Sequence, residues 1–569
     1  MKKIFCLLVL FVIIGYAKPI QRPIRFAVIG DRTGEAQPNI YEQIIAEIEQ
    51  IKPDFVLTVG DMIEGPAKDT VEINSRWQEY QSLIKKLSMP VYYVPGNNDI
   101  WDNTSYIFYE RYVGKPYYSF DKYGIHFVML DVSRWDASKD IPKDQISWLI
   151  NDLKKNQKAS YTFVFYHKPF WADEIAQGKP DTLHQLFKNF GVDAVFNGHT
   201  HEYFSGKIDN ILYTCVGSSG GATDAGPTGI LYHYTWVTVD KNGISIAPIK
   251  INSVFPWDEV SIFDVININK INSAGIVFDK SVLVKDDFSV IDTMFTVKII
   301  NPNSTLTIED TLSWTTNESW SIKPSAQLIK VAPNDSTIYK FIVKNKKKLY
   351  PVPEVSLKFP YAQDKYYEVK KSLAVSRTAN CNQTEKPPFI DGKINEPVWQ
   401  KPVCRLFSPD GSPTKIDSTF FYFAYDDKNL YLAAYCKDLK IDAITTKTAE
   451  RDGAVYADDC IGYFFAPNQD TIYQIYFNPN GVVFDQKIAS NGYWADQKWN
   501  GEYEVKTYQG KNYWSIEARI PLEQLKAKAD VGNEWCVNFR RKQPRYKSSA
   551  DWQVPIQYDP KTFGRLILK

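Results

Sequence analysis

Five short segments of the chain each follow an apolar run with a side chain that can bind a metal ion. They read VIGDRTG, VLTVGDMIEG and VPGNNDI near the amino terminus, and FYHKPF and NGHTHEY further on. Because such apolar runs favour buried strands, we expect the side chains that follow them to converge on one rim of a sheet. Carboxylates and imidazoles at such a rim predict a site for two metal ions. The candidate ligands are Asp31, Asp61, Asn97, His167, His199 and His201.

A site for two ions held about 3.5 to 4 Å apart needs a bridging carboxylate, terminal ligands and open positions for water and substrate. Asp61 is the candidate bridge, because a carboxylate has two oxygens to share. A single aspartate after a strand is commonly only a cap or turn residue, but six ligand types in order after five strands favour the metal site. The expected ligands are Asp31 and His201 for one ion, and Asn97, His167 and His199 for the other.

The elements that must position these ligands alternate between strands and amphipathic helices from about Arg25 to Val239. Apolar residues recur on one helical face over residues 40–51 and again over 146–153. A third helix, from Thr182 to Phe190, should end at Gly191. This alternation predicts an α/β layered domain. The predicted strands cover residues 26–29, 55–59, 91–94, 126–130, 162–166, 194–196 and 211–216.

The blocks GDRTG, GDMIEG, GNND, YHKPF and GHTH, in this order, resemble the signature of calcineurin-like metallophosphoesterases over roughly residues 24–270. The resemblance implies a four-layer fold, in which a β-sandwich is flanked by helices. It also implies a binuclear Mn, Fe or Zn centre that activates water for in-line attack on a phosphate ester. We expect this domain to occupy residues 18–270.

Two positions depart from the family pattern. Many members carry Asp-x-His in the first block, where this chain has Asp31-Arg32-Thr33, so Thr33, Glu64 or water is the candidate replacement ligand. In GNND, Asn98 stands where family members carry a histidine that is thought to protonate the leaving group. An amide cannot supply a proton, so general-acid help worth roughly 10²- to 10⁴-fold would be missing.

Three residues are the candidate catalytic groups beside the metal ligands: Asn98, Asp99 and Arg32. Asp99 would have oriented the missing histidine, and we expect it to hold the Asn98 amide instead. Arg32 could assist hydrolysis. The remaining histidines lie in predicted strands and helices and favour ordinary structural roles; they are His126, His184 and His233.

Beyond about residue 270 the helical periodicity gives way to the alternation of strands. Residues 271–376 predict a small Ig-like β-sandwich, which we interpret as a spacer, with a partner-binding module as the alternative. Residues 377–569 predict a second, larger all-β sandwich. Its runs IDGKINEPVWQ, AYDDKNLYLAAYC, YADDC, NPNG, WSIEARIP, WCVNFRR, DW and FGRLIL together resemble a family-9 carbohydrate-binding module.

Such modules hold a sugar between aromatic faces, with polar groups bonding its hydroxyls. By position in the motif, Tyr456 and Trp552 are the candidate aromatic walls, and Arg540 and Asn538 the candidate hydroxyl partners. That Tyr456 and Trp552 belong to the core instead remains open. We expect Trp399, Trp514 and Trp535 in the core, and Asp458 with Asp459 as possible ligands of a structural Ca²⁺.

Residues 1–17 carry two lysines, a short apolar core and small residues before a cleavage point, which predict a signal peptide. A membrane anchor is the alternative, although the apolar core is shorter than the roughly 20 residues that a span needs. We expect a secreted or periplasmic protein with no transmembrane anchor after cleavage. Export permits disulfides, and Cys381 with Cys404 is the predicted pair.

Formal net charge is +1, which argues against nucleic acid as the default partner. The leading hypothesis is an exported metal-dependent phosphoesterase that hydrolyses a phosphomonoester or phosphodiester. Its last module would direct it to a polysaccharide or cell-surface glycan. The alternatives are a protein that binds phosphate and sugar without turnover, and a cell-surface structural protein.

Overall fold

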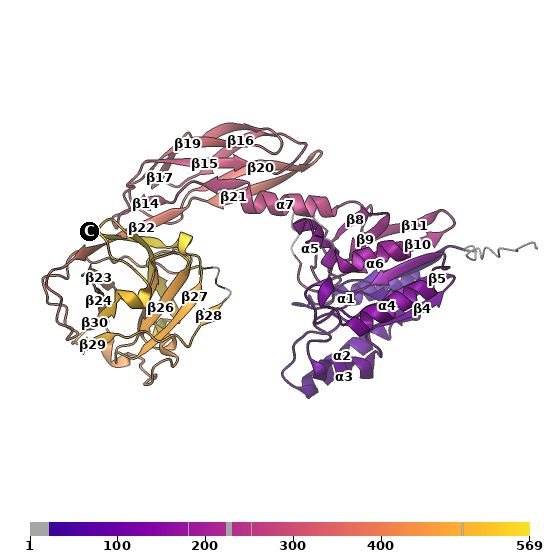
Figure 1. The fold of residues 1–569 in the computed structure, drawn as a ribbon, viewed down its shortest axis with the longest axis horizontal. Helices are drawn as coiled ribbons and strands as arrows, with labels where there is room; N and C mark the ends of the chain where they lie inside the picture. The colour runs from indigo at the N-terminus through magenta and orange to yellow at the C-terminus, as the bar shows by residue number, and fades with distance from the viewer. Residues whose placement is uncertain (1–21, 180, 224–229, 252, 491, 493) are drawn as a thin grey trace, which may run out of the picture. The chain divides into compact units, whose positions relative to one another are not determined.

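A computed structural model describes residues 22–179, 181–223, 230–251, 253–490, 492 and 494–569 (Figure 1). The predicted signal peptide lies outside the described residues. The chain divides into two compact units between Asn269 and Lys270, one residue from the predicted boundary. Among the described residues, no helix is long and apolar enough to cross a membrane.

The first unit is built on two six-stranded sheets. The parallel strands β1, β2 and β3 form one side of the first sheet, and β5, β6, β7 and β9 run parallel in the second. In spatial order the first sheet comprises β12 (Ser253–Val254), β11 (Gly243–Lys250), β10 (His233–Asp240), β1 (Ile24–Ile29), β2 (Phe55–Thr58) and β3 (Val91–Tyr92). The second comprises β4 (Tyr118–Lys122), β5 (Ile125–Met129), β6 (Tyr161–Phe165), β7 (Ala194–Asn197), β9 (Ile211–Cys215) and β8 (Phe204–Ile208).

Helices cover the outer faces of these sheets. One buried core joins side chains of both sheets, including Phe26, Phe127 and Phe163. A second core packs α1 to α3 on the first sheet, and a third packs α4 to α6 on the second. The four-layer α/β prediction is therefore confirmed. The helices are α1 (Ile40–Ile51), α2 (Thr70–Ile84), α3 (Asn103–Tyr112), α4 (Lys143–Lys155), α5 (Phe170–Gln177), α6 (Thr182–Phe190) and α7 (Ile262–Ala274).

Local sequence explains where α6 begins and ends. The Asp181 carboxylate accepts a hydrogen bond from the Leu183 amide at the first turn. Gly191 ends the helix in a left-handed conformation with φ 72°, which glycine adopts without a steric penalty. The predicted bounds of this helix are confirmed.

The second unit contains two all-β regions, as predicted. The middle region packs two four-stranded sheets on one core that includes Phe295, Trp314 and Phe341. Its immunoglobulin-like topology stays a prediction. The sheets are β13 (Ile276–Phe278), β15 (Met294–Ile300), β19 (Ser336–Asn345) and β17 (Trp320–Lys323), and then β18 (Ala326–Val331), β16 (Ile308–Thr315), β20 (Glu354–Ala362) and β21 (Lys365–Ser372).

The last region is a thirteen-stranded assembly that folds over its own core. Strand β22 pairs with β33 at residues 378–381 and with β23 at residues 382–383, so it joins the two halves. In spatial order the main path is β28 (Ala495–Asp496), β27 (Val483–Ala489), β26 (Thr471–Phe477), β25 (Cys460–Ala466), β31 (Glu534–Gln543), β33 (Gly564–Leu568), β22 (Val375–Gln383), β23 (Thr419–Tyr425), β24 (Asn429–Lys437), β30 (Tyr513–Pro521) and β29 (Glu504–Gln509). Two further strands, β14 (Val282–Val284) and β32 (Ser548–Asp551), pair with β22 and β31.

The predicted boundary at residues 376/377 falls inside β22. Val375, at the start of this strand, belongs to the core of the middle region, whereas Ala379 and Cys381 belong to the core of the last. Between them the buried Arg377 guanidinium donates to Asp286 Oδ1 at 2.7 Å and to the Trp552 carbonyl at 2.6 Å. The middle and last regions are thus joined by the shared strand β22 and by the ion pair between the buried Arg377 and the half-buried Asp286.

The predicted Cys381–Cys404 disulfide is wrong, because both cysteines are free. Cys381 is buried in the core of the last region, where burial raises the pKa of its thiol. Cys404 instead faces Asp286, with its sulfur 3.9 Å from Oδ2.

Candidate functional site

All six predicted metal ligands follow the carboxyl ends of strands in the two sheets of the first unit. Asp31, Asp61 and Asn97 follow β1, β2 and β3; His167 follows β6, and His199 and His201 follow β7. Three of these residues have left-handed backbones: φ is 55° for Asp61, 77° for His199 and 59° for His201. Such conformations are costly for residues with side chains and cluster at functional sites.

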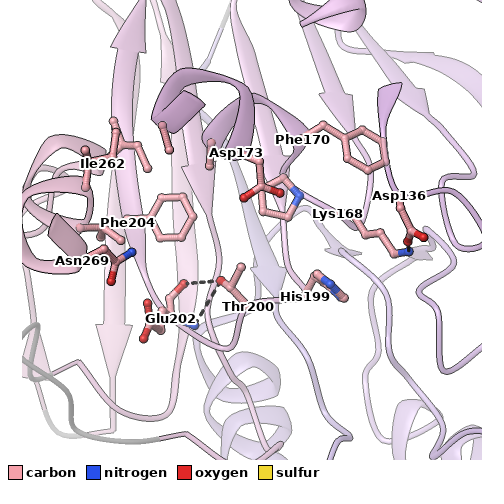
Figure 2. Close-up of a pocket in the computed structure, with 15 residues that line it drawn as sticks. Asp136, Lys168, Phe170, Asp173, His199, Thr200, Glu202, Phe204, Ile262 and Asn269 are labelled. Carbon is pink, nitrogen blue, oxygen red and sulfur yellow. Dashed lines mark hydrogen bonds and ion pairs between the residues drawn. The ribbon is translucent and has the colours of Figure 1, made fainter. Parts of the chain in front are cut away.

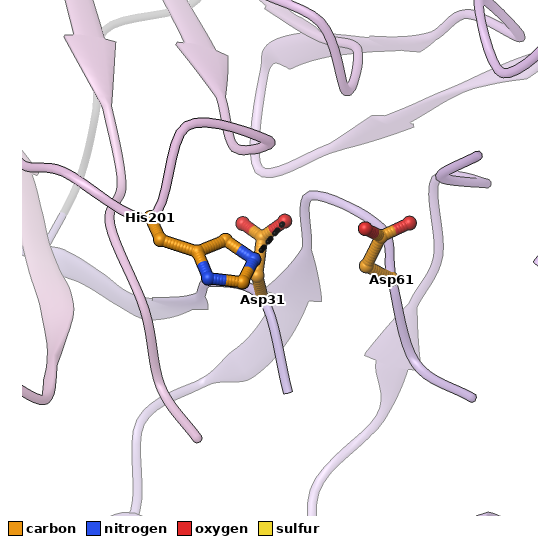
Figure 3. A group of neighbouring side chains, drawn as sticks. All are labelled: Asp31, Asp61 and His201. Atoms are coloured by element: carbon orange, nitrogen blue, oxygen red, sulfur yellow. Dashed lines mark ion pairs between the residues drawn. The ribbon is translucent and has the colours of Figure 1, made fainter. Parts of the chain in front are cut away.

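Asp31, Asp61 and His201 form the first group of ligands (Figure 3). Each offers one ligand atom, and these atoms all lie within 4.8 Å of one another. His201 Nε2 is 3.8 Å from Asp31 Oδ1. The other ring nitrogen, Nδ1, bonds the Ala222 carbonyl at 2.5 Å, which fixes the ring and leaves Nε2 as the atom for a metal.

His167 stands at the centre of the second group. Its Nε2 lies 3.0 Å from Asn97 Oδ1, 3.3 Å from His199 Nδ1 and 3.4 Å from Asp61 Oδ1. Its Nδ1 bonds the Val59 carbonyl at 2.7 Å, so Nε2 again faces the site. Two ligands about 2.1 Å from one ion lie roughly 3.0 to 3.4 Å apart at right or tetrahedral angles. The spacing around His167 therefore fits a bound divalent ion.

The buried carboxylates at this site favour the binding of cations. Asp31 and Asp61 are buried, and in the described part of the chain the ion pairs they form are with histidines. Burial, with a further contribution from Asp61, raises the pKa of Asp31 to about 6 against the opposing effect of His167. Burial lowers the pKa of His167, but Asp61 and Asp31 outweigh it and raise the pKa to about 9. Burial lowers the pKa of His199 to about 4. Buried oxygen and nitrogen donors of this kind fit divalent metals.

Glycines in the signature blocks let these ligands approach the backbone. A Cβ on Gly60 would lie 2.7 Å from His167 Nδ1, and one on Gly96 would meet the Asp61 carboxylate. One on Gly198 would likewise meet the Asp31 carboxylate. In each of the dipeptides GD, GN and GH, the second residue is a candidate metal ligand. The glycine before it has no side chain and so leaves room for a ligand from another loop.

Asn98 and Asp99 both lie at the site, but their contacts differ from the prediction. Asn98 Nδ2 donates to Asp61 Oδ2 at 3.1 Å, and its backbone amide donates to Asp61 Oδ1 at 2.8 Å. The Asp99 carboxylate accepts hydrogen bonds from the backbone amides of Gly96, Met62 and Ile63, not from the Asn98 side chain. Asn98 therefore holds the Asp61 carboxylate, while Asp99 ties the GDMIEG and GNND loops together.

The structure commits Arg32, Thr33 and Glu64 to other contacts. Arg32 bonds the Met62 carbonyl and Glu79, so two of its nitrogens are turned to structural partners instead of a substrate. The Thr33 hydroxyl bonds the carbonyls of Asp61 and Ile63. Glu64 Oε2 accepts from the Gly34 amide at 3.2 Å. These contacts favour loop bracing by the three side chains, and their predicted roles as an assisting group and as replacement ligands stay predictions.

The other three histidines have structural partners, as predicted. His126 lies between Asp121 and Asp152, with both nitrogen–oxygen distances at 2.8 Å. His184 bonds the Tyr213 hydroxyl, and His233 bonds the Leu231 carbonyl.

The candidate sugar site of the last region is not formed as predicted. Trp552 is fully buried against Phe539, so it offers no face to a sugar. Asn538 is also fully buried, and its amide bonds the backbone of Gln553. Arg540 forms a two-point ion pair with the buried Asp551, at 2.6 and 3.0 Å.

Tyr456 alone among the predicted sugar residues keeps an open face. It is 45% exposed and packs edge-on against Phe484, so its role as an aromatic wall stays a prediction. Trp399, Trp514 and Trp535 are buried, as predicted.

The predicted calcium ligands bond backbone amides of the protein. Asp458 accepts from the amides of Lys447 and Thr448, and Asp459 accepts from the Thr445 amide. Asp459 Oδ1 accepts no hydrogen bond in the described part of the chain, and Arg541 Nη2 lies 3.5 Å from it. A calcium site at this pair stays a prediction. In the described part of this region, another acidic group whose oxygens lie within 4.8 Å of one another comprises Asp391, Glu396 and Glu517.

Sequence reasoning missed the groups that orient the ligands. The Val59 and Ala222 carbonyls bond the two imidazoles, but backbone atoms have no signal in the sequence. It also missed the pocket beside His199, which Lys168 helps to line. Lys168 stands in the YHKPF block, directly after the ligand His167. This position in the sequence could have indicated that Lys168 lies beside the metal site.

Two family models match the chain. Residues 24–203 match the family described as calcineurin-like phosphoesterase, and residues 390–569 match the family described as carbohydrate family 9 binding domain-like. The chain thus joins a calcineurin-like phosphoesterase domain to a family-9-type carbohydrate-binding region, which confirms both predicted resemblances.

Among similar proteins, purple acid phosphatase 15 of Arabidopsis thaliana is 25% identical over 254 residues, covering 36% of this chain and 46% of that protein. The serine/threonine-protein phosphatase CPPED1 of Homo sapiens is 24% identical over 222 residues, covering 34% and 69%. The chain thus spans about half the length of the first of these relatives.

Solved structures similar to parts of the chain include a dimetal phosphatase from Danio rerio, with 12% identity and a TM-score of 0.31, covering 41% of this chain and 96% of that one. A family-9 carbohydrate-binding module from Caldicellulosiruptor kristjanssonii, in complex with glucose, has 17% identity and a TM-score of 0.23, covering 34% and 96%.

Proposed function

We propose that the protein is an exported, metal-dependent phosphoesterase that hydrolyses a phosphomonoester or phosphodiester. One observation carries the proposal: carboxylate, amide and imidazole groups from the ends of five strands converge at the spacing of ligands around a divalent ion. The match of residues 24–203 to calcineurin-like phosphoesterases supports the same reaction. The family-9-type region would bring the enzyme to a polysaccharide or cell-surface glycan.

The residues of the site would hold two ions, with Mn, Fe and Zn as the candidates. Asp31 and His201 would hold one ion, and Asn97, His167 and His199 would hold the other. Asp61 would contribute to both. When bound, the ions supply an activated water and positive charge for the phosphoryl oxygens. The carbonyls of Val59 and Ala222 keep the imidazoles in the orientation that binding requires.

Asn98 fixes the Asp61 carboxylate through two hydrogen bonds and thereby holds the shared ligand in place. Its amide cannot protonate a departing alkoxide, so that oxygen must take its proton from water. Hydrolysis should therefore be slow for alcohols that are poor leaving groups and faster for phenols.

The test begins with removal of metal and restoration with Mn²⁺. Hydrolysis of 4-nitrophenyl phosphate and bis(4-nitrophenyl) phosphate is then measured for the wild type, Asn98→His and Asp61→Asn. We expect the wild type to act on at least one ester, and Asp61→Asn to act on neither. With phenyl phosphate, whose leaving group is poorer, Asn98→His should increase the rate by about 10²-fold.

A second candidate function is binding of a phosphorylated ligand without turnover, which the amide at position 98 favours. Activity that is absent from the wild type but appears in Asn98→His would support this function and contradict the first. Activity that survives Asp61→Asn would contradict the proposed site itself.

A further inference from the structure

A pocket of about 340 Å³ opens beside the metal ligands of the first unit (Figure 2). His199 stands at its edge, so a phosphate held at the site would have its ester group next to this space. The pocket is lined by α5, β8 and α7, which contribute Phe170, Phe204, Ile262 and Val265. The four side chains are apolar, and a group that enters among them would exchange water for hydrocarbon contact.

The charged side chains around the pocket oppose an anionic occupant. Lys168 Nζ lies 2.8 Å from Asp136 Oδ1 and donates to the Trp135 carbonyl at 2.9 Å, so its charge is already balanced. Asp173 adds a further carboxylate to the lining. A phosphate ester with a second negative group on its alcohol would therefore be repelled here.

We propose that this pocket holds the alcohol part of the phosphate ester, and that the substrate is an ester of an uncharged alcohol with an apolar ring or chain. The proposal rests on the proposed function. In the reaction, an oxygen of water bonds to phosphorus and this water gives up one proton to the solvent. The bond from phosphorus to the alcohol oxygen breaks, and that oxygen takes one proton from solvent water, so the products are the free alcohol and phosphate. An aryl group would contact the apolar side chains of the pocket. Its phenolate oxygen is also a good leaving group, so it departs without the proton that Asn98 cannot donate.

The test compares two phosphonates that cannot be hydrolysed, phenylphosphonate and methylphosphonate, by calorimetric titration of the Mn²⁺-loaded full chain. They share the charged group and differ in the ring that would enter the pocket. We expect phenylphosphonate to bind about tenfold more tightly. 4-Carboxyphenylphosphonate should lose most of this advantage, because it adds a negative charge.

Two variants on the same helix provide the matched control. Val265→Glu places a carboxylate in the pocket lining, whereas Phe263→Glu changes a neighbouring side chain that is 57% exposed and does not line it. The preference for phenylphosphonate should disappear in Val265→Glu and persist in Phe263→Glu. Hydrolysis of acetyl phosphate, whose leaving group is small, should equal that of the wild type in Phe263→Glu, which lies outside the pocket.

Equal binding of the two phosphonates by the wild type would overturn the proposal, as would a preference that Val265→Glu leaves intact. Failure of both phosphonates to bind would overturn it together with the metal centre. A preference that is present without any hydrolysis would contradict the proposed function and leave the pocket assignment standing.

Discussion

The two family-matched regions of this chain keep their motif residues in opposite states. In the first unit, Asp31, Asp61 and His167 are buried, and His167 Nε2 lies 3.9 Å from Asp31 Oδ1 and 3.4 Å from Asp61 Oδ1. In the last region, Asn538 and Asp458 are equally buried, but backbone groups occupy their polar atoms. Position in a motif therefore does not by itself show that a polar side chain is available to a ligand.

The practical difference is that the first unit gathers imidazole nitrogens around its buried carboxylates, whereas the last region surrounds its motif residues with backbone groups. A ligand for a metal or a sugar needs atoms that the protein itself does not saturate. In the first unit, His167 and His201 each have one nitrogen bonded to a carbonyl and the other facing a carboxylate. Four predictions test this comparison, in order of decreasing effect.

Asp61→Asn should have the largest effect, because it weakens the ligand shared by both ions. We expect hydrolysis to fall by about 10³-fold or more, and bound metal, measured by elemental analysis, to fall with it. Asp458→Asn is the matched control in the last region and should change neither quantity. Equal metal content in Asp61→Asn and the wild type would remove the proposed difference between the regions.

Trp552→Ala should act on stability instead of ligand binding. Its indole is fully buried and packs on Phe539, with ring centroids 5.0 Å apart. We expect the free energy of unfolding of the second unit to fall by about 3 to 5 kcal/mol, measured by denaturant titration. Phe389→Ala, at a side chain that is 76% exposed, should change it by less than about 0.5 kcal/mol. Similar losses in the two variants would show that Trp552 is not a core residue.

His126→Gln tests a saturated histidine within the first unit. Burial lowers the pKa of His126, but Asp152 and Asp121 outweigh burial and raise it above its ordinary value. The folded state therefore binds the proton more tightly. The stabilisation is complete below the unfolded pKa of about 6.5 and is lost as the pH rises through the folded pKa.

We expect His126→Gln to cost about 2 kcal/mol at pH 5 and less at pH 9, as measured by urea unfolding at both pH values. Metal content should not change, because His126 bonds two carboxylates and no metal ligand. A larger cost at pH 9 would contradict the sign of the pKa shift.

Tyr456→Ala should have the smallest effect on stability, about 0.5 kcal/mol or less, because the ring is partly exposed. Its effect on glycan binding decides whether any part of the predicted sugar site survives. Reduced retention on a glycan array would support an aromatic wall here. Retention equal to that of the wild type would leave the last region without a predicted sugar contact.

Much of the first unit could be predicted from sequence, because each ligand follows an apolar run that forms a strand. Periodic apolar residues also located α1 and α4, and Gly191 located the end of α6. The left-handed backbones of Asp61, His199 and His201 could not be predicted, since they depend on how the loops pack on each other. The partners of Asn98 and Asp99 were hidden for the same reason.

In the last region, position in the motif predicted that Trp552 and Asn538 would be accessible to a sugar, and both are buried. An aromatic residue and a polar residue on one strand can face either the core or the solvent, and burial depends on the opposing sheet. Trp552 and Asn538 lie inside, whereas Tyr456 lies in a short turn before β25. The boundary within β22 was hidden because a strand that serves two cores has no break in composition.

The continuity of β22 affects how the second unit should unfold and how it can be divided. Its first residues are buried in one core and its later residues in the other, with Arg377 bonded across the junction. Loss of either core would expose half of this strand, so we expect residues 270–569 to melt in a single cooperative calorimetric transition. A fragment that starts at residue 377 would lack the first part of β22 and its partner β14, and a fragment that starts at residue 270 would retain both.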